Sequence, residues 1–110
     1  MSAGKVVTVS DAEFETSVVQ NEKPAIVDFW AEWCQPCQML TPTIEELATD
    51  YADRVKVGKV DTDANREVPV KYGINAIPTI ILFQGGEVKK KFVGLTSKEQ
   101  FQEAIDELMA

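Results

Sequence analysis

The run Ala25-Ile26-Val27-Asp28-Phe29-Trp30-Ala31 limits the fold more than any other feature, because apolar residues occupy six of its seven positions. The run is much shorter than the ~18 residues that a membrane-spanning helix needs, and it lacks the alternation of a strand with one face in water. An unbroken run of this length is typical of a strand buried on both faces, as in a parallel sheet covered by helices. We therefore expect a central buried strand that carries one carboxyl group.

Both ends of the chain carry helix signals. Val6–Val9 predicts a short strand, and Ser10 then begins a helix in which Glu13, three residues on, completes a capping box. Near the C-terminus, Thr96 with Glu99 predicts a second capping box for a terminal helix.

The middle of the chain predicts the remaining elements. A helix begins near Pro36, a third strand is marked by Val55, Val57 and Val60 and ends in Asp61-Thr62-Asp63, and a short helix covers Asn65–Tyr72. The apolar run Thr79–Phe83 predicts a fourth strand, and two glycines then predict a hairpin to a partner strand over Glu87–Val93. The order β-α-β-α-β-α-β-β-α predicts one α/β domain, residues 1–110, with a mixed sheet and helices on its faces.

Composition excludes several classes of function. A net charge of −7 leaves no basic stripe that could displace counterions from phosphates, so we expect no nucleic-acid partner. The one positive run, Lys89-Lys90-Lys91, suits an edge strand that is protected from pairing with other chains. The chain has no histidine. This excludes Ser-His-Asp and Cys-His hydrolases, as well as zinc sites built on histidine.

The sequence also predicts a location. No apolar run is long enough to span a bilayer, so we expect no membrane partner. The segment Met1–Val9 has one lysine and no apolar core, unlike a secretory signal. We expect a cytoplasmic protein, or one of an organelle stroma or matrix if a leader was removed earlier.

Two cysteines, Cys34 and Cys37, lie where the buried strand gives way to a helix. The amide groups and dipole of a helix N-terminus favour an anion, so Cys34 is expected to hold a thiolate readily. Helical residues three apart have Cβ atoms about 5–6 Å apart, close to disulfide geometry, and Pro36 fits the first turn. Such a dithiol can attack a disulfide with Cys34 and release the product with Cys37. Alternatives are a local staple or, with partner thiolates, a metal site shared between subunits.

Asp28 and Lys59 are candidates for proton chemistry. Asp28 lies in an otherwise apolar strand, where desolvation raises the pKa of a carboxyl group and makes it a proton carrier. Lys59 alternates in phase with Val55 and Val57, so it shares the apolar face of its strand. The alternatives are a carboxylate satisfied by backbone or water, and a lysine that extends to solvent.

Several separated motifs resemble the thioredoxin family. They are Val27-Asp28-Phe29-Trp30-Ala31-Glu32-Trp33-Cys34-Gln35-Pro36-Cys37, Lys71-Tyr72-Gly73-Ile74, Ile77-Pro78-Thr79, Gly85-Gly86-Glu87-Val88 and Val93-Gly94. The resemblance covers essentially the whole chain. It implies the thioredoxin fold, a central mixed five-stranded sheet flanked by four helices. It also implies a protein-disulfide reductase without cofactor or metal, working as a monomer.

The resemblance assigns roles by position. Cys34 corresponds to an exposed attacking thiol and Cys37 to a buried resolving thiol, with Asp28 assisting proton transfer and Lys59 close to that carboxylate. Pro78 corresponds to a proline held in cis, although a trans proline that begins a strand is the alternative. The implied substrate-binding residues are Trp33, Gln35, Pro36, Gly73, Ile74, Ile77, Pro78, Val93 and Gly94. The implied partners are disulfide-containing target proteins and a thioredoxin reductase linked to NADPH or ferredoxin.

Two positions depart from the family pattern. Gln35 stands where glycine is usual, and Gln38 where lysine is frequent. Neither change removes a reacting atom, but both can alter the redox potential, and Gln35 adds a side chain to the docking surface. Two alternatives therefore stay open: a disulfide isomerase or oxidant with a raised potential, and an interaction subunit without turnover.

Overall fold

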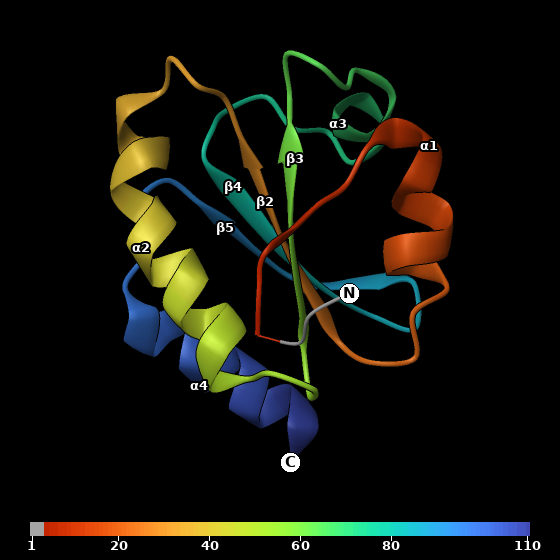
Figure 1. Ribbon diagram of the computed structural model, residues 1–110, viewed down its shortest axis with the longest axis vertical. Coiled ribbons are helices and arrows are strands. Elements are labelled where there is room, and N and C mark those ends of the chain that lie inside the picture. Colours follow the sequence, from red (N-terminus) through yellow and green to blue (C-terminus); the bar gives the residue numbers. More distant parts are fainter. Residues whose placement is uncertain (1–3) are drawn as a thin grey trace.

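A five-stranded mixed sheet forms the centre of the protein (Figure 1). The structure is a computed structural model and describes residues 4–110, so the first three residues of the N-terminal segment discussed above lie outside it. The strand order is β1-β3-β2-β4-β5, with β1, β3 and β2 parallel and β4 and β5 antiparallel to their neighbours. The strands are β1 (Val7–Thr8), β2 (Ala25–Trp30), β3 (Lys56–Asp61), β4 (Thr79–Gln84) and β5 (Glu87–Val93).

Helices cover both faces of this sheet, as the sequence predicts. One layer contains α2 (Gln35–Asp50) and α4 (Lys98–Met109), and the other contains α1 (Asp11–Phe14), a π-helical turn η1 (Glu15–Val19) and α3 (Glu67–Lys71) (Figure 1). Each layer packs its apolar side chains on the sheet, giving two separate hydrophobic cores. The predicted α/β class, the order of elements and the five-stranded sheet are confirmed.

Strand β2 is the central strand, and it contributes to both cores. Ile26 belongs to the core under α2 and α4, whereas Val27 and Phe29 belong to the opposite one. Asp28 shares the face of Ile26, because side chains two apart in a strand point the same way. Its register partners are Lys59 on β3 and Ile80 on β4. The apolar run therefore places one carboxyl group between the sheet and the layer of α2 and α4.

The two expected capping boxes have different outcomes. At the first helix, the backbone N–H of Ser10 donates to Glu13 Oε1 at 3.3 Å, as predicted. At α4 the expected pair, Thr96 with Glu99, is wrong by one residue: Ser97 caps the helix together with Gln100. Thr96 is unavailable because its hydroxyl donates to the carbonyl of Gly94 at 3.1 Å.

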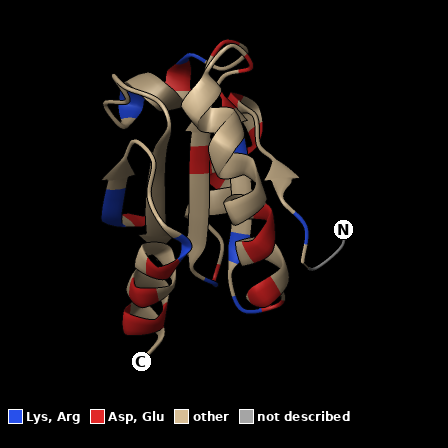
Figure 2. Cartoon of the chain, turned by 90° about the vertical axis from the view of Figure 1, so that its left-hand side faces the viewer, with Lys and Arg blue, Asp and Glu red and all other residues tan. Residues whose placement is uncertain are grey.

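Charged residues are unevenly spread over the surface. Figure 2 shows acidic residues along the exposed sides of α2 and α4. Lys98 joins these two helices through ion pairs with Glu46 at 2.9 Å and Asp50 at 2.8 Å. The three consecutive lysines lie on β5, which is an edge strand as predicted. Within residues 4–110, no helix is both long and apolar enough to cross a membrane.

A single side chain connects the first helix to α3, which lies 55 residues further on. The carboxylate of Asp11 accepts hydrogen bonds from the backbone N–H groups of Arg66, Glu67 and Val68, at 3.0, 3.0 and 2.9 Å. The bond is reciprocated, because the N–H of Asp11 donates to Asn65 Oδ1 at 2.7 Å. Since the first N–H groups of a helix have no partner within it, Asp11 supplies the missing acceptor.

We expect Asp11→Ala to lower the free energy of unfolding by about 1–2 kcal/mol, because three backbone donors lose their acceptor. Urea unfolding monitored by circular dichroism measures this loss. The matched control is Glu15→Ala, which removes an exposed carboxylate on the same segment and is expected to change stability by less than about 0.5 kcal/mol. Equal stabilities for the two variants would contradict the assignment.

Candidate active site

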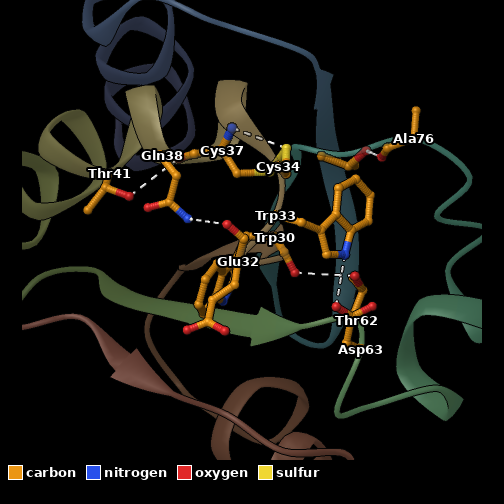
Figure 3. The surroundings of a disulfide bond; sticks show 11 residues. Trp30, Glu32, Trp33, Cys34, Cys37, Gln38, Thr41, Thr62, Asp63 and Ala76 are labelled. Atoms are coloured by element: carbon orange, nitrogen blue, oxygen red, sulfur yellow. Dashed lines mark hydrogen bonds between the residues drawn. A yellow bond between two sulfur atoms is a disulfide. The ribbon is translucent and has the colours of Figure 1, made fainter.

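The two cysteines lie at the start of α2, after the short loop that follows β2 (Figure 3). Cys34 is the N-cap residue, and its sulfur accepts a hydrogen bond from the backbone N–H of Cys37 at 3.2 Å. The two side chains form a disulfide, with Cα atoms 5.2 Å apart. Pro36 lies in the first turn, where its missing N–H would have no helical partner. The predicted placement of the pair at a helix N-terminus is confirmed.

The exposure of the cysteines differs from the expectation. We expected an exposed Cys34 and a buried Cys37, but their exposed fractions are 4% and 2%, so both are buried in the disulfide form. The disulfide turns the two sulfur atoms toward one another, and both residues pack with Ala31, Trp30 and Ile77. What distinguishes the two thiols is therefore position: Cys34 caps the helix, and Cys37 lies within it.

Trp33 is the most prominent exposed residue beside the disulfide. Its exposed fraction is 71%, yet its indole Nε1 donates to Asp63 Oδ2 at 2.9 Å (Figure 3). Asp63 is in turn held by its own N–H, which donates to Asp61 Oδ1 at 2.9 Å. The sequence alone predicts no role for Asp61 and Asp63, because acidic residues in a polar loop are ordinarily solvated charges.

A groove of about 340 Å³ runs from Trp33 over the loop before β4 and along α3. Its walls include three of the expected substrate-binding residues. They also include Val70 of α3 and Arg66, which directly precedes this helix. The expected residues in the walls are Trp33, Ile74 and Ile77.

The other expected binding residues have different positions. Pro78 follows a cis peptide bond from Ile77, as the resemblance implied, and its carbonyl accepts from the N–H of Gly94 at 2.8 Å. Val93 ends β5 opposite Thr79, with 62% of its surface exposed. Gly73 lies two residues after α3 in the left-handed region, with φ +66°, and does not line the groove.

The two glutamines that depart from the family pattern do not donate side-chain hydrogen bonds to the disulfide sulfur atoms. The side chain of Gln35 is exposed at the first position of α2. Gln38 donates from Nε2 to the carbonyl of Glu32 at 3.1 Å, which connects α2 to the loop before Cys34. Among the described residues, only the backbone N–H of Cys37 donates to a disulfide sulfur.

Asp28 is buried, with an exposed fraction of 5%. Burial raises the pKa of its carboxyl group from 3.8 to about 7, and the ammonium group of Lys59 offsets part of that rise. Lys59 is half-buried on the neighbouring strand, and its Nζ lies 5.0 Å from the ring centroid of Trp30. A carboxyl group with a pKa near 7 can both accept and return a proton at neutral pH.

A cavity of about 220 Å³ lies next to this carboxyl group. Its walls include the buried Asp28 and the exposed Glu32, Gln38 and Glu45, so the cavity connects the core to the surface. Within residues 4–110, no group of three His, Cys, Asp or Glu side chains is arranged to hold a metal ion. The structure thus has a disulfide at a helix N-terminus and a titratable carboxyl group on the strand that precedes it.

Comparison with known proteins identifies the family of this chain. The family model described as thioredoxin matches residues 5–107. The chain belongs to the thioredoxin family. It is 51% identical to a thioredoxin of Rickettsia bellii over 89% of this chain and 93% of that protein. Identity is 46% with a thioredoxin of Acidithiobacillus ferridurans and 45% with one of Pseudomonas aeruginosa, each over 92% of this chain and 94% of that protein.

Membership of the thioredoxin family, together with the Cys34–Cys37 disulfide, establishes the activity. The protein is a thiol-disulfide oxidoreductase that reduces protein disulfides. Its membership further implies a thioredoxin reductase as electron donor and disulfide-containing proteins as targets.

The pKa of Asp28 predicts how the stability of this thioredoxin depends on pH. Between about pH 4 and pH 7 the folded state holds a proton that the unfolded chain has released, so stability falls as pH rises through this window. The rise of about three pH units corresponds to at most about 4 kcal/mol. We expect Asp28→Asn, which cannot ionise, to be more stable than the natural protein above pH 7, with the advantage shrinking toward pH 4.

Urea unfolding of the oxidised protein at a series of pH values measures this difference. Glu45→Gln is the matched control, because it neutralises an exposed carboxylate of the same cavity and is expected to show no such trend. An Asp28→Asn variant that is no more stable than the natural protein at about pH 8.5 would show that burial does not raise this pKa.

Proposed function

We propose that Cys34 is the attacking thiol and Cys37 the resolving thiol of this reductase. The Cys34 thiolate attacks one sulfur of a target disulfide, so a Cys34–target bond forms as the target bond breaks and a target thiolate leaves. The Cys37 thiolate then attacks Cys34 Sγ and releases the second target thiolate. Two electrons pass to the target, and the Cys34–Cys37 disulfide forms.

The N-cap position of Cys34 carries this assignment. Its sulfur already accepts the N–H of Cys37 and lies at the positive end of the sixteen-residue helix α2, where an anion is favoured. Cys37 lies inside the helix and packs against the core, so it is suited to an attack from within after the target has bound.

We propose that Asp28 accepts the proton of Cys37 during resolution, with Lys59 tuning its proton affinity. Resolution requires the Cys37 thiol to lose a proton in surroundings that contain few polar groups. Asp28 supports this role because its pKa of about 7 allows it to take up a proton at neutral pH. The adjoining cavity gives the proton a path to the surface.

We propose that the target segment binds along the groove beside the disulfide. Its exposed apolar wall at Trp33 is pre-oriented by Asp63, so little side-chain freedom is lost on binding. The backbone of Ile77 is proposed to pair with the target chain. The remaining proposed contacts are Gln35, Pro36, Gly73, Ile74, Pro78, Val93 and Gly94.

The electron donor, location and assembly are further proposals. We propose a thioredoxin reductase that draws on NADPH or on ferredoxin, a cytoplasmic location, and a monomer made of a single domain. One family model matches residues 5–107 as a single unit, which supports a single domain over these residues.

Single cysteine variants test the proposed roles. We expect Cys34→Ser to reduce protein disulfides no faster than the uncatalysed background, because the attacking thiolate is lost. Cys37→Ser is expected to form a stable adduct with a disulfide-containing protein, because the resolving step is lost. The measurements are turnover with a reductase and its electron source, and intact mass.

Cys34→Ser also serves as the control for the trapping experiment, since it retains one thiol of the same motif. An adduct on Cys34→Ser but not on Cys37→Ser would reverse the two roles. Adducts on neither variant, with full partner binding by a double serine variant, would favour the interaction subunit over the enzyme.

A redox titration tests the remaining alternative, a disulfide donor. Because neither Gln35 nor Gln38 bonds to a sulfur atom, we expect a midpoint potential more reducing than that of the glutathione couple. Thiol labelling against dithiol buffers measures it, with Gln35→Gly as the matched control. A midpoint on the oxidising side of glutathione would favour an isomerase or oxidant.

A further inference from the structure

Two buried side-chain polar atoms within residues 4–110 have no hydrogen-bond partner among the protein's own groups: Asp28 Oδ1 and Trp30 Nε1. Leaving either atom unsatisfied costs roughly 1–3 kcal/mol, and buried polar groups in folded proteins are almost always paired. One is an acceptor and the other a donor, so a single polar molecule between them can satisfy both.

These two atoms belong to neighbouring side chains on one face of β2. Asp28 and Trp30 are two residues apart in the strand, so their side chains point to the same side of the sheet. Both line the cavity of about 220 Å³, together with Lys59 and Thr41. This volume exceeds what one water molecule needs, and the walls offer the two to four polar partners that a buried water requires.

Trp30 also contacts the disulfide. Its side chain packs on the cluster of Ala31, Cys34 and Cys37, and its ring lies under Lys59 Nζ. Its carbonyl is held by Thr62, whose backbone N–H donates at 2.9 Å and whose hydroxyl donates at 3.2 Å (Figure 3). Trp30 is thus a fixed residue that belongs both to the disulfide cluster and to the Asp28 cavity.

We propose that a water molecule in this cavity accepts a hydrogen bond from Trp30 Nε1 and donates one to Asp28 Oδ1, which makes Trp30 a positioning residue for the carboxyl group. The role rests on the proposed function of Asp28 as proton carrier. A water that already accepts from the indole directs a hydrogen toward the carboxylate, and this orientation favours the ionised form of Asp28.

The charged groups around Asp28 are few. Lys59 faces it from β3, while Glu32 from the loop after β2 and Glu45 from α2 line the outer part of the same cavity. β4 contributes the apolar Ile80 opposite Asp28. Trp30→Phe changes none of these charges and keeps an aromatic ring beneath Lys59, so it removes the N–H donor selectively.

The experiment follows the Asp28 carboxyl carbon by NMR through a pH titration. We expect Trp30→Phe to raise the midpoint by about half to one pH unit, the size of one ordinary hydrogen bond. The matched control is Trp33→Phe, which removes the other indole N–H of the chain. Because that donor bonds to Asp63 and lines the groove, the midpoint of Asp28 is expected to stay unchanged. An unchanged or lowered midpoint in Trp30→Phe would overturn the proposal.

A second measurement does not depend on Trp30→Phe folding correctly. In the Trp33→Phe protein, Trp30 is the only indole, and its N–H chemical shift is expected to titrate with the midpoint of Asp28. Asp28→Asn in the same background is expected to abolish that titration, and an indole signal that stays flat in both proteins would overturn the water bridge. Neither measurement uses turnover, so the water bridge can be disproved while Asp28 keeps its role as proton carrier. Full activity of Asp28→Asn across the pH range would instead disprove that role.

Discussion

Strand β2 lies between two layers of helices, and its burial on both faces fixes the position of everything used in disulfide exchange. Because the strand is central, β3 and β4 hold it in register on either side. Its carboxyl end therefore delivers Cys34 to one point, the start of α2. The same burial raises the pKa of Asp28 to about 7. The position of the cysteines and the proton affinity of Asp28 thus have one physical origin, the burial of β2.

The buried carboxyl group of Asp28 lowers the stability of the folded protein when it is ionised, but it provides a group that can transfer a proton at neutral pH. An ionised carboxylate inside a core is costly, and Lys59 offsets only part of that cost. The fold keeps the cost moderate by placing Asp28 beside a cavity that reaches the surface, instead of in the closed core on the other face of the sheet. A carboxyl group sealed among Phe29 and Val27 would remain protonated at neutral pH and could not return a proton to solvent.

Much of this could be predicted from the sequence because the responsible interactions are local. Capping at Ser10 and the turn from β2 to α2 depend on residues close together in the chain, and the burial of β2 is marked by its own unbroken apolar run. The helix α4 is capped one residue later than predicted, because the hydroxyl of Thr96 donates to the carbonyl of Gly94. Likewise, the bond from Trp33 to Asp63 spans thirty residues, and no local pattern marks it. The burial of Cys34 depends on how Trp30 and Ile77 pack against it, which the spacing of the two cysteines does not specify.

The two glutamines illustrate how such a site divides its tasks. The sulfur of Cys34 is bonded by a backbone N–H and lies at the helix end, and neither feature uses the side chain at position 35 or 38. The side chain of Gln38 fastens α2 to the preceding loop, and that of Gln35 remains exposed beside the disulfide. Backbone geometry thus secures the exchange reaction, while the side chain at Gln35 is available to discriminate between partners. Sequence variation at these positions is therefore expected to alter which proteins dock more than whether a docked disulfide is reduced.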